Sequence, residues 1–521
     1  MMQIWVVCQI ASIFVTNQSK KIHKERRKHV KDRLMSEKAM SNINREYIKK
    51  AYEQGIEAII LLIESIVKEH GNQLQELSKR LEELENQKAK NSKNSHQPPS
   101  TDGFGKQTKS LRKKSERKVG GQEGHEGHNL PWQETADLVI KHEIVECQVC
   151  GYDLREVVGE IVEKRQVHDL PVIKVQVTEH QIEKKQCPHC HLVRVSKFPK
   201  TVEHWVQYGE NIKGLVTYLN QYQLIPSQRV QELMKEVFGC EIGQGTIYNL
   251  VQKCHQVLEP VEAKIKEQIQ DATVTHFDET GTRVNGKGLW LHVSSSETHT
   301  HYQVHEKRGQ VAMDAIGILP NYKGKAVHDG FKSYNQYQCS HYLCNAHHLR
   351  ELTFIHERFN QPWAEKMIDL LCTINDEVKQ AKLEHQTALE PSKISTFELQ
   401  FQQIIDLGYK DNPEPVLDLA LPKTRGRKKR PKPLNLILRL DLQREQVLGF
   451  MYDFAVPFDN NLAERDIRMT KLKLKTSGCF RSLKGANAFA RIRGYISTLR
   501  KQGLHILDSL VSLFRGNPLF V

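Results

Sequence analysis

Residues 273–280 read TVTHFDET, and residues 324–330 read GKAVHDG. Each stretch is a short run that favours a β-strand and carries an aspartate. In the first stretch Val274, His276 and Asp278 fall on one face, because alternate residues of a strand point to the same side. The second stretch is a strand that ends at Asp329. These two acids on two strands are the basis for predicting the fold.

Further strands are expected between and beside these stretches. Residues 284–293 read VNGKGLWLHV, in which an Asn-Gly turn leads into a second strand, and residues 300–305 can form a third. A short helix is expected over residues 312–319. Three antiparallel strands, a helix and a further strand that bears an acid follow the chain order of a ribonuclease H-like core. In such a core Asp278 and Asp329 lie on adjacent central strands.

A third carboxylate comes much later, in residues 458–471, which read FDNNLAERDIRMTK. Asp459 or Asn460 can cap a helix here, and spacings of four and three place Glu464, Arg468 and Lys471 on one face. Such a face offers one metal ligand and two partners for phosphate. Three carboxylates suit a pair of Mg²⁺ ions that assist phosphoryl transfer. Taken alone, each acid is more often a cap or a solvated charge, so the hypothesis depends on all three.

Length and charge limit the class of protein. The chain of 521 residues has room for roughly three or four domains. Its 76 Lys and Arg against 62 Asp and Glu give a net charge of +14, which favours nucleic acid as the partner. The apolar run over residues 1–15 is too short for a membrane span, so we expect a cytoplasmic protein without membrane contact. Met35 and Met40 are alternative starts, and residues 1–35 are treated as an extension.

Residues 36–90 are predicted to form a coiled coil. Apolar or tolerated residues recur there at alternating spacings of four and three: Ile56, Ile60, Ile63, Val67, His70, Leu74, Leu77, Leu81 and Leu84. Charged residues surround this narrow stripe, which favours a homo-oligomer over one amphipathic helix packed on its own domain. Residues 91–140 are predicted to be a linker with a basic run at 106–118 and a glycine-rich segment. The basic run is either solvated or contacts DNA.

Four of the eleven cysteines form two C-x-x-C pairs: Cys147, Cys150, Cys187 and Cys190. Four thiolates complete a tetrahedral structural zinc site with no position left for a substrate. Residues 141–205 are therefore predicted to be a zinc-ribbon domain that holds one Zn²⁺, with strands expected over residues 161–177. The alternative is reduced structural cysteines or a redox pair, and it requires two such pairs to occur together by chance.

Residues 206–256 are predicted to form a helix-turn-helix. Residues 229–238 have helical periodicity, Gly239 can supply a left-handed turn, and a second helix starts near Thr246. Residues at the start of this second helix are the candidates for DNA contact: Gln244, Thr246, Tyr248 and Asn249. The alternative is a helical hairpin without a role in DNA recognition.

Taken together, these residues resemble the transposases of insertion sequence 66, a group of DDE transposases, over nearly the whole chain from the coiled coil onward. The resemblance rests on several motifs in the same order: the linker ending in Pro98-Pro99-Ser100, the glycine-rich residues 120–125, the two cysteine pairs, Asp278-Glu279-Thr280, Asp329-Gly330, Cys344-Asn345-Ala346-His347, and residues 460–465, 478–482 and 490–498. Residues 471–475 read KLKLK, where the family more often has an Arg-Lys-Asn sequence. The N-terminal extension is also unusual for the family.

The resemblance implies a DNA transposase whose catalytic acids are Asp278, Asp329 and Glu464, with two Mg²⁺ ions. Glu279 is set aside, because neighbouring strand residues face opposite ways and only one can enter the site. The implied zinc ligands are the four cysteines of the C-x-x-C pairs. The implied partners are double-stranded DNA at the element ends and at the target, and helper proteins from the same element. Activated water would cleave a strand and leave a 3′ hydroxyl, which then attacks target DNA.

We therefore expect a multidomain α+β protein. Its ribonuclease H-like catalytic domain spans residues 270–505, with a helical insertion over 349–454 that includes a basic segment at 423–432, and residues 506–521 form a C-terminal tail. A non-catalytic DNA-binding regulator derived from such an element is the alternative function, but it is expected to have lost an acid, and all three are present. A structure-specific nuclease would cut DNA strands without joining them.

Overall fold

The computed structural model describes residues 52–53, 56–91, 93–95, 130–414 and 430–519. It divides into two compact units, Met1–Lys90 and Asn91–Val521. The basic run at 106–118, the glycine-rich segment and most of the basic segment at 423–432 lie outside the described residues.

The first unit contains one long helix, α4 (Ile56–Lys88). Residues of its predicted stripe point into solvent in the single chain: Ile60 is 44% exposed, Leu74 66% and Leu81 60%. The helix is confirmed, and its pairing with a second copy stays a prediction.

The second unit contains a helical region before the sheet. Its helices are α5 (Glu210–Thr217), the π-helix η2 (Tyr218–Tyr222), α6 (Ser227–Phe238), α7 (Gln244–Val257) and α8 (Glu259–Gln270). Gly239 ends α6 in the left-handed conformation with φ of 62°, as predicted. Val230, Met234 and Ile247 are buried in one cluster that joins α6 to α7. The predicted pair of helices and its turn are confirmed.

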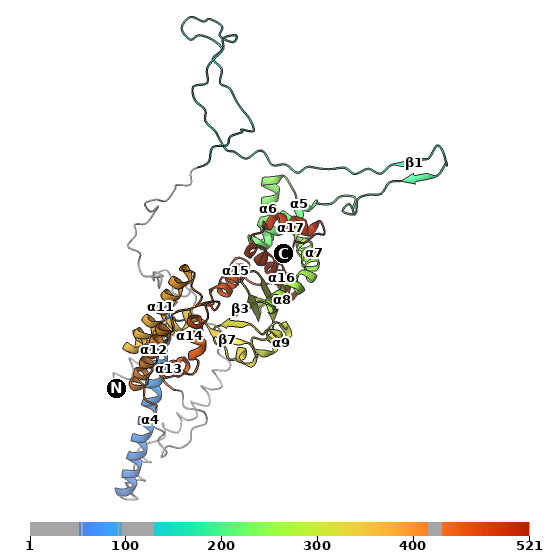
Figure 1. Ribbon diagram of the computed structural model, residues 1–521. Coiled ribbons are helices and arrows are strands. Elements are labelled where there is room, and N and C mark those ends of the chain that lie inside the picture. Colours follow the sequence, from blue (N-terminus) through green and yellow to red (C-terminus); the bar gives the residue numbers. More distant parts are fainter. Residues whose placement is uncertain (1–51, 54–55, 92, 96–129, 415–429, 520–521) are drawn as a thin grey trace. The chain divides into compact units, whose positions relative to one another are not determined.

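A five-stranded mixed sheet follows, in the order β5-β4-β3-β6-β7 (Figure 1). Its strands are β3 (Val274–Val284), β4 (Lys287–Ser295), β5 (Thr300–His305), β6 (Lys325–His328) and β7 (Ser340–Leu343). β3, β4 and β5 are antiparallel neighbours, whereas β3, β6 and β7 run parallel. The helix α9 (Gln310–Ile316) and the 3₁₀ turn η3 (Leu319–Asn321) connect β5 to β6. The expected strand order along the chain is confirmed, and β3 and β6 are adjacent.

The sheet is buried on both faces. Phe277 belongs to a core with Met313, while Val293 belongs to a second core with Ala463 and Ile467 of α15 (Asn461–Ser477). The helix α16 (Leu483–Lys501) contributes to both cores. Phe277 and Val284 of β3 therefore belong to different cores.

The remaining helices follow the sheet. The 3₁₀ turn η4 (Lys332–Gln336) lies within the sheet region, directly before β7. After β7 come the helices of the insertion: α10 (Asn345–Phe359), α11 (Pro362–Leu383), α12 (Pro391–Asp411), α13 (Lys432–Leu442) and α14 (Arg444–Tyr452). Residues 506–521, expected to be a tail, hold the helix α17 (Ile506–Phe514), which packs on α5. Gly214 of α5 permits this close approach, because a Cβ there would lie 2.5 Å from Val511. Across the described residues, every helix is too short or too polar to cross a membrane.

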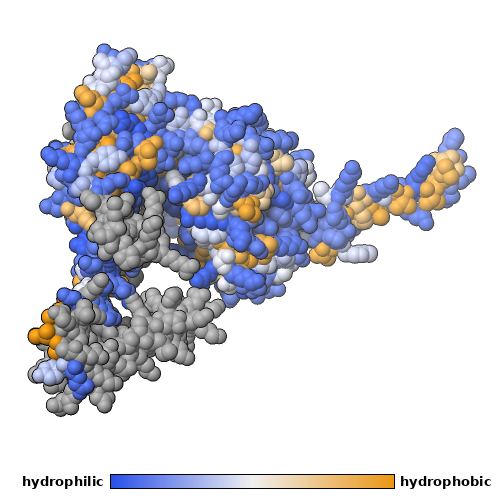
Figure 2. Space-filling model, turned by 90° about the horizontal axis from the view of Figure 1, so that it is seen from below, coloured by the Kyte–Doolittle hydropathy of each residue, from blue (hydrophilic) through white to orange (hydrophobic). Residues whose placement is uncertain are grey.

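The segment before α5 contains a small hairpin of β1 (Lys184–Gln186) and β2 (Val193–Val195). The strands expected over residues 161–177 are not formed, and apolar side chains there are exposed, with Val162 at 92% and Val167 at 90%. Hydrophobic residues at the surface of the protein are orange in Figure 2. A strand needs a partner for its backbone groups. Within the described residues, the long-range hydrogen bonds of 161–177 join Gln166 to Gln133. Alternation alone therefore did not produce a sheet here.

Candidate active site

Asp278 and Asp329 are brought together by the parallel pairing of β3 with β6. The register pairs His276 with Val327, and Asp278 and Asp329 come two residues further along their chains. Asp278 lies within β3, and Asp329 directly follows β6. Gly330 then turns the chain with φ of 85°, a conformation that favours glycine.

The carboxyl group of Asp278 lies among other acids. Burial raises its pKa well above the usual range, and the negative charges of Glu279, Asp329 and Glu464 raise it further. The backbone N–H of Glu279 donates a hydrogen bond of 2.8 Å to Asp278 Oδ1 and opposes this rise in pKa. The three predicted acids therefore form one cluster in which the negative charges repel one another. A cation bound among them would relieve this repulsion.

Glu464 joins the cluster because Asn460, directly before α15, holds that helix against β3. Asn460 is completely buried. Its Nδ2 donates to the carbonyl oxygen of Phe277 at 2.9 Å, and its Oδ1 lies 2.8 Å from His276 Nδ1. Its backbone N–H donates to Cys344 Sγ at 3.1 Å. Of the two expected caps, Asn460 makes no side-chain capping bond and instead fixes α15 to the sheet, whereas Asp459 Oδ1 accepts a hydrogen bond of 3.0 Å from the backbone N–H of Asn461 at the start of the helix.

Two basic side chains of α10 face Glu464. His347 Nε2 lies 3.7 Å from Glu464 Oε1, and Arg350 Nη2 lies 3.9 Å from Oε2. Glu464 Oε1 is buried and accepts no hydrogen bond from any described residue. This oxygen can accept a further ligand, as the metal hypothesis requires.

A second possible group of metal ligands shares Glu464. The ligand atoms of Cys344, His347 and Glu464 all lie within 4.8 Å of one another. Burial raises the pKa of the metal-free Cys344 thiol to about 12. Cys344 also already accepts the hydrogen bond from Asn460. We therefore assign Cys344 to holding α15 rather than to binding metal.

Glu279 points to the opposite face of β3 from Asp278, as expected. Its side chain is fully buried, and its carboxylate accepts hydrogen bonds from Arg308 Nε at 2.7 Å and from Tyr334 Oη at 2.6 Å. Arg308 Nη2 also lies 3.8 Å from Asp329 Oδ2. Neither Arg308 nor Tyr334 was predicted from the sequence, because both lie outside the strands, Arg308 after β5 and Tyr334 in η4.

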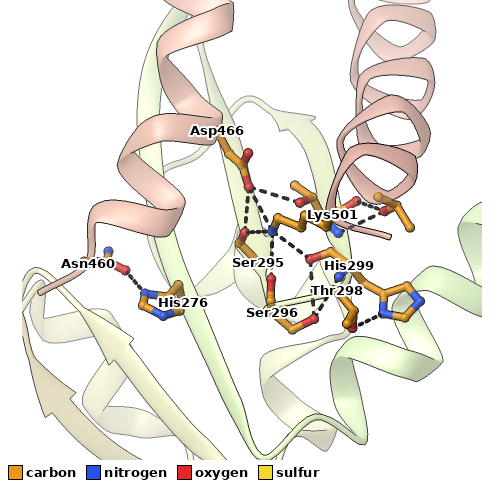
Figure 3. Close-up of polar contacts among 10 residues, drawn as sticks. His276, Ser295, Ser296, Thr298, His299, Asn460, Asp466 and Lys501 are labelled. Carbon is orange, nitrogen blue, oxygen red and sulfur yellow. Dashed lines mark hydrogen bonds and ion pairs between the residues drawn. The ribbon is translucent and has the colours of Figure 1, made fainter. Parts of the chain in front are cut away.

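A polar network fixes the other side of α15 (Figure 3). Asp466 Oδ2 accepts hydrogen bonds from Ser295 at 2.6 Å and Thr300 at 3.0 Å, and lies 3.2 Å from Lys501 Nζ of α16. Lys501 also donates to the carbonyl oxygens of Ser296 at 2.7 Å and His299 at 3.2 Å. Asn460 and Asp466 thus hold α15 on both sides of Glu464.

The predicted DNA-contacting residues lie at two places. Lys471 Nζ donates to the carbonyl oxygen of Gly281 at 3.2 Å. Burial lowers the pKa of Lys471, and the negative charge of Asp278 opposes this effect, so Lys471 lies near the acids. Arg468 is exposed on the same helix. The other candidates lie in the first turns of α7. Gln244, Tyr248 and Asn249 are exposed there, and Thr246 is partly exposed.

The two cysteine pairs form matching turns. Cys147 N donates to Tyr152 O and Gly151 N donates back to Cys147 O, each at 2.9 Å. The same two bonds, also at 2.9 Å, recur as Cys187 N to Leu192 O and His191 N to Cys187 O. Backbone N–H groups directed at the first sulfur of each pair lower the pKa of Cys147 and Cys187. The four sulfurs do not come together as one group of ligands. In the described part of the chain, the one group of three or more possible metal ligands is Cys344, His347 and Glu464.

Comparisons with known proteins identify the family. The protein-family model described as Transposase IS66 family matches residues 206–488. This range is more than half of the 521 residues and includes all three acids. A second model, described as a family of unknown function (DUF6444), matches residues 49–131. No curated protein matches the chain. Because the first match covers the helical region, the sheet and α15, the chain belongs to the IS66 family of transposases.

Proposed function

We propose that this protein is a DNA transposase that binds the ends of an insertion sequence and catalyses strand cleavage and strand transfer. The observation that carries the proposal is the cluster of Asp278, Asp329 and Glu464, which come from β3, the end of β6 and α15. The strand order β5-β4-β3-β6-β7 supports a ribonuclease H-like core for this cluster. Family membership supports DNA as the substrate.

The acids fit Mg²⁺ in chemistry and in electrostatics. All three offer carboxylate oxygens, the ligands that Mg²⁺ prefers. Glu464 Oε1 lacks a hydrogen bond from the described residues, and the pKa of Asp278 is raised by burial and then by the other acids. When bound, the metal would lower the pKa of water and stabilise charge at the phosphate. The three acids would hold it, with His347 and Arg350 beside Glu464.

The proposed reaction has two phosphoryl transfers. In cleavage, water loses a proton as its oxygen bonds to phosphorus, the bond from phosphorus to the 3′ oxygen breaks, and the 3′ oxygen takes up a proton. In strand transfer, the new 3′ hydroxyl loses its proton and bonds to a phosphorus of the target, and a target 3′ oxygen leaves as a hydroxyl. Lys471, close to Asp278, and the exposed Arg468 supply positive charge for the DNA backbone.

DNA recognition is assigned to the helical region and to the cysteine turns. The accessible positions Gln244, Thr246, Tyr248 and Asn249 could lie in the major groove, as the second helix of a helix-turn-helix does. The matching turns of the two cysteine pairs support a single Zn²⁺ held by Cys147, Cys150, Cys187 and Cys190, a structural site that would order the segment before α5. A coiled coil through α4 would supply the homo-oligomer.

The test is cleavage by Glu464→Gln of a duplex that carries the terminal repeat flanking the gene. With Mg²⁺, the variant should lose cleavage and keep its affinity for the duplex, because an amide is a poor ligand for a hard cation. Glu445→Gln is the matched control, since Glu445 is an exposed acid in the first turn of α14. Wild-type cleavage by Glu464→Gln would contradict the assignment.

A further inference from the structure

Arg308 is held beside the acid cluster by contacts on several sides. Its Nε donates a hydrogen bond of 2.7 Å to Glu279 Oε1, and its Nη2 lies 3.8 Å from Asp329 Oδ2. The guanidinium carbon lies 4.3 Å from the ring centre of Phe331 and 5.0 Å from that of Trp290. These contacts fix both the plane and the direction of the guanidinium group.

Glu279 makes this position rigid. Its side chain has no exposed surface, and its second oxygen is occupied by the hydroxyl of Tyr334 at 2.6 Å. Tyr334 is itself buried, with its ring stacked on that of His328 at 4.5 Å between ring centres. A chain of buried contacts therefore runs from the core to Arg308, and the group is positioned before any ligand arrives.

The outer end of Arg308 has unused hydrogen-bonding capacity. A guanidinium carries five N–H groups, and Arg308 uses the one at Nε for Glu279. Neither Nη atom makes a hydrogen bond with a described residue, and the side chain is 38% exposed. Four N–H groups of a permanently charged, partly exposed side chain thus have no hydrogen-bond partner among the described residues, and they lie next to Asp329.

We propose that Arg308 is a further catalytic residue, which donates its Nη hydrogen bonds to a non-bridging oxygen of the scissile phosphate. The inference rests on the proposed function, because it places the phosphate at Asp278, Asp329 and Glu464. A preorganised donor of this kind stabilises the charge that develops in the transition state. It also explains Glu279, which serves to hold Arg308 rather than to bind metal.

A structural role for Arg308 is the competing explanation. In that case Arg308 only neutralises the buried carboxylate of Glu279, and replacing both by neutral residues should preserve the fold and the reaction. The double variant Glu279→Gln with Arg308→Met separates the two roles. If Arg308 is catalytic, the double variant should unfold near the wild-type temperature, and its cleavage rate should nevertheless be at least about 100-fold lower than that of the wild type.

The experiment measures single-turnover cleavage of terminal-repeat DNA by Arg308→Met, Arg308→Lys and the double variant. Arg308→Lys keeps the charge and loses the planar pair of donors, so it should also be at least about 10-fold slower. Lys307→Met removes the same charge from the exposed neighbouring residue and should cleave like the wild type. Where Arg308→Met does not fold, the other two variants decide.

A binding measurement supplies an independent readout. Duplexes with either a normal phosphate or a neutral methylphosphonate at the scissile position are compared in Ca²⁺. The wild type should prefer the phosphate several-fold more than the double variant does, because Arg308 senses the charge. Equal preference, or cleavage by the double variant at the wild-type rate, would overturn the inference. Asp329→Asn is tested for cleavage beside these variants. If the test of Arg308 fails while Asp329→Asn does not cleave, only the role of Arg308 is refuted. If Asp329→Asn cleaves, the proposed function itself is refuted.

Discussion

Asp278 is the acid whose pKa is raised by the negative charges of all the neighbouring acids of the site. It lies in the middle of the sheet, faces α15 and is surrounded by Glu279, Asp329 and Glu464. In an ordinary protein core such an acid is paired with a base. Here the ionised form of Asp278 is disfavoured, so the position lowers stability and is best explained by a ligand that offsets the cost.

Asp278→Asn should therefore raise the thermal stability of the metal-free protein. The pKa of Asp278 is higher in the folded than in the unfolded chain, where it is about 3.9. Below that pH the group is protonated in both states, and stability is lost as the pH rises through the folded pKa. The unfolding temperatures of wild type and variant should thus agree near pH 4 and diverge toward pH 8, with the variant higher. A wild type that is the more stable of the two at pH 8 without metal would show that Asp278 is already paired.

The acids could be predicted from sequence, and their neighbours could not. Asp278 lies in β3, Asp329 directly follows β6, and Glu464 lies in the first turn of α15. The order of strands and helix along the chain predicted that the two aspartates lie on adjacent strands. Arg308 and Tyr334 lie outside the strands and reach Glu279 from 29 and 55 residues away. Contacts of this kind depend on how loops fold back on the sheet, which has no period in the sequence.

At the scale of elements, α15 is the part that must be placed accurately. Its Glu464 lies between two anchors, Asn460 on β3 and Asp466 on the β4–β5 turn and α16. Asp466 and Lys501 have side chains only 16% and 12% exposed, so their ion pair is shielded from water. Shielded pairs depend strongly on both partners.

Asp466→Asn should lower the free energy of unfolding by about 3 kcal/mol, because it leaves the charge of Lys501 buried without its partner. Chemical denaturation measures this change. Asp376→Asn is the control, since Asp376 pairs with Lys379 on the surface and its loss should cost no more than about 1 kcal/mol. Equal effects of the two substitutions would mean that the network of Asp466 does not hold α15.

The cysteine turns lead to a prediction about metal content. If the two turns meet on one ion, freshly purified protein should contain one Zn²⁺ per chain, and Cys187→Ser should lose it. Cys479→Ser, which changes a free cysteine outside the turns, should keep the metal. Elemental analysis decides the matter, and a zinc-free wild type would leave the turns without a role in metal binding.

Elements with local signals were predicted more successfully than elements that need a distant partner. Gly239 marks the end of α6 by itself, and the Asn285-Gly286 turn between β3 and β4 has positive φ at both residues, as that dipeptide predicts. The alternation over residues 161–177 carried no information about a partner strand, and no strand formed there. The helix α17 was missed because residues 506–514 are short and depend on packing against α5.

At the scale of the whole molecule, the two compact units suggest a division of roles. The first unit contains α4 with its exposed stripe, and the second contains the sheet and the acids. Deleting residues 1–90 should therefore reduce the mass in solution to that of a monomer and leave the unfolding of the second unit unchanged. Sedimentation measures the mass, and Leu74→Asp with Leu81→Asp in the full chain should have the same effect. An unchanged mass in both cases would rule out assembly through α4.

The central claim is that Asp278, Asp329 and Glu464 act together as one metal-dependent centre for DNA cleavage. The most direct measurement is the rate of cleavage of terminal-repeat DNA against Mg²⁺ concentration for wild type, Asp278→Asn, Asp329→Asn and Glu464→Gln, with DNA affinity measured in parallel. The proposal predicts that cleavage requires Mg²⁺, that each variant is at least about 100-fold slower at every concentration, and that all bind DNA. Cleavage at the wild-type rate by any one of the three, or cleavage without a divalent cation, would contradict it.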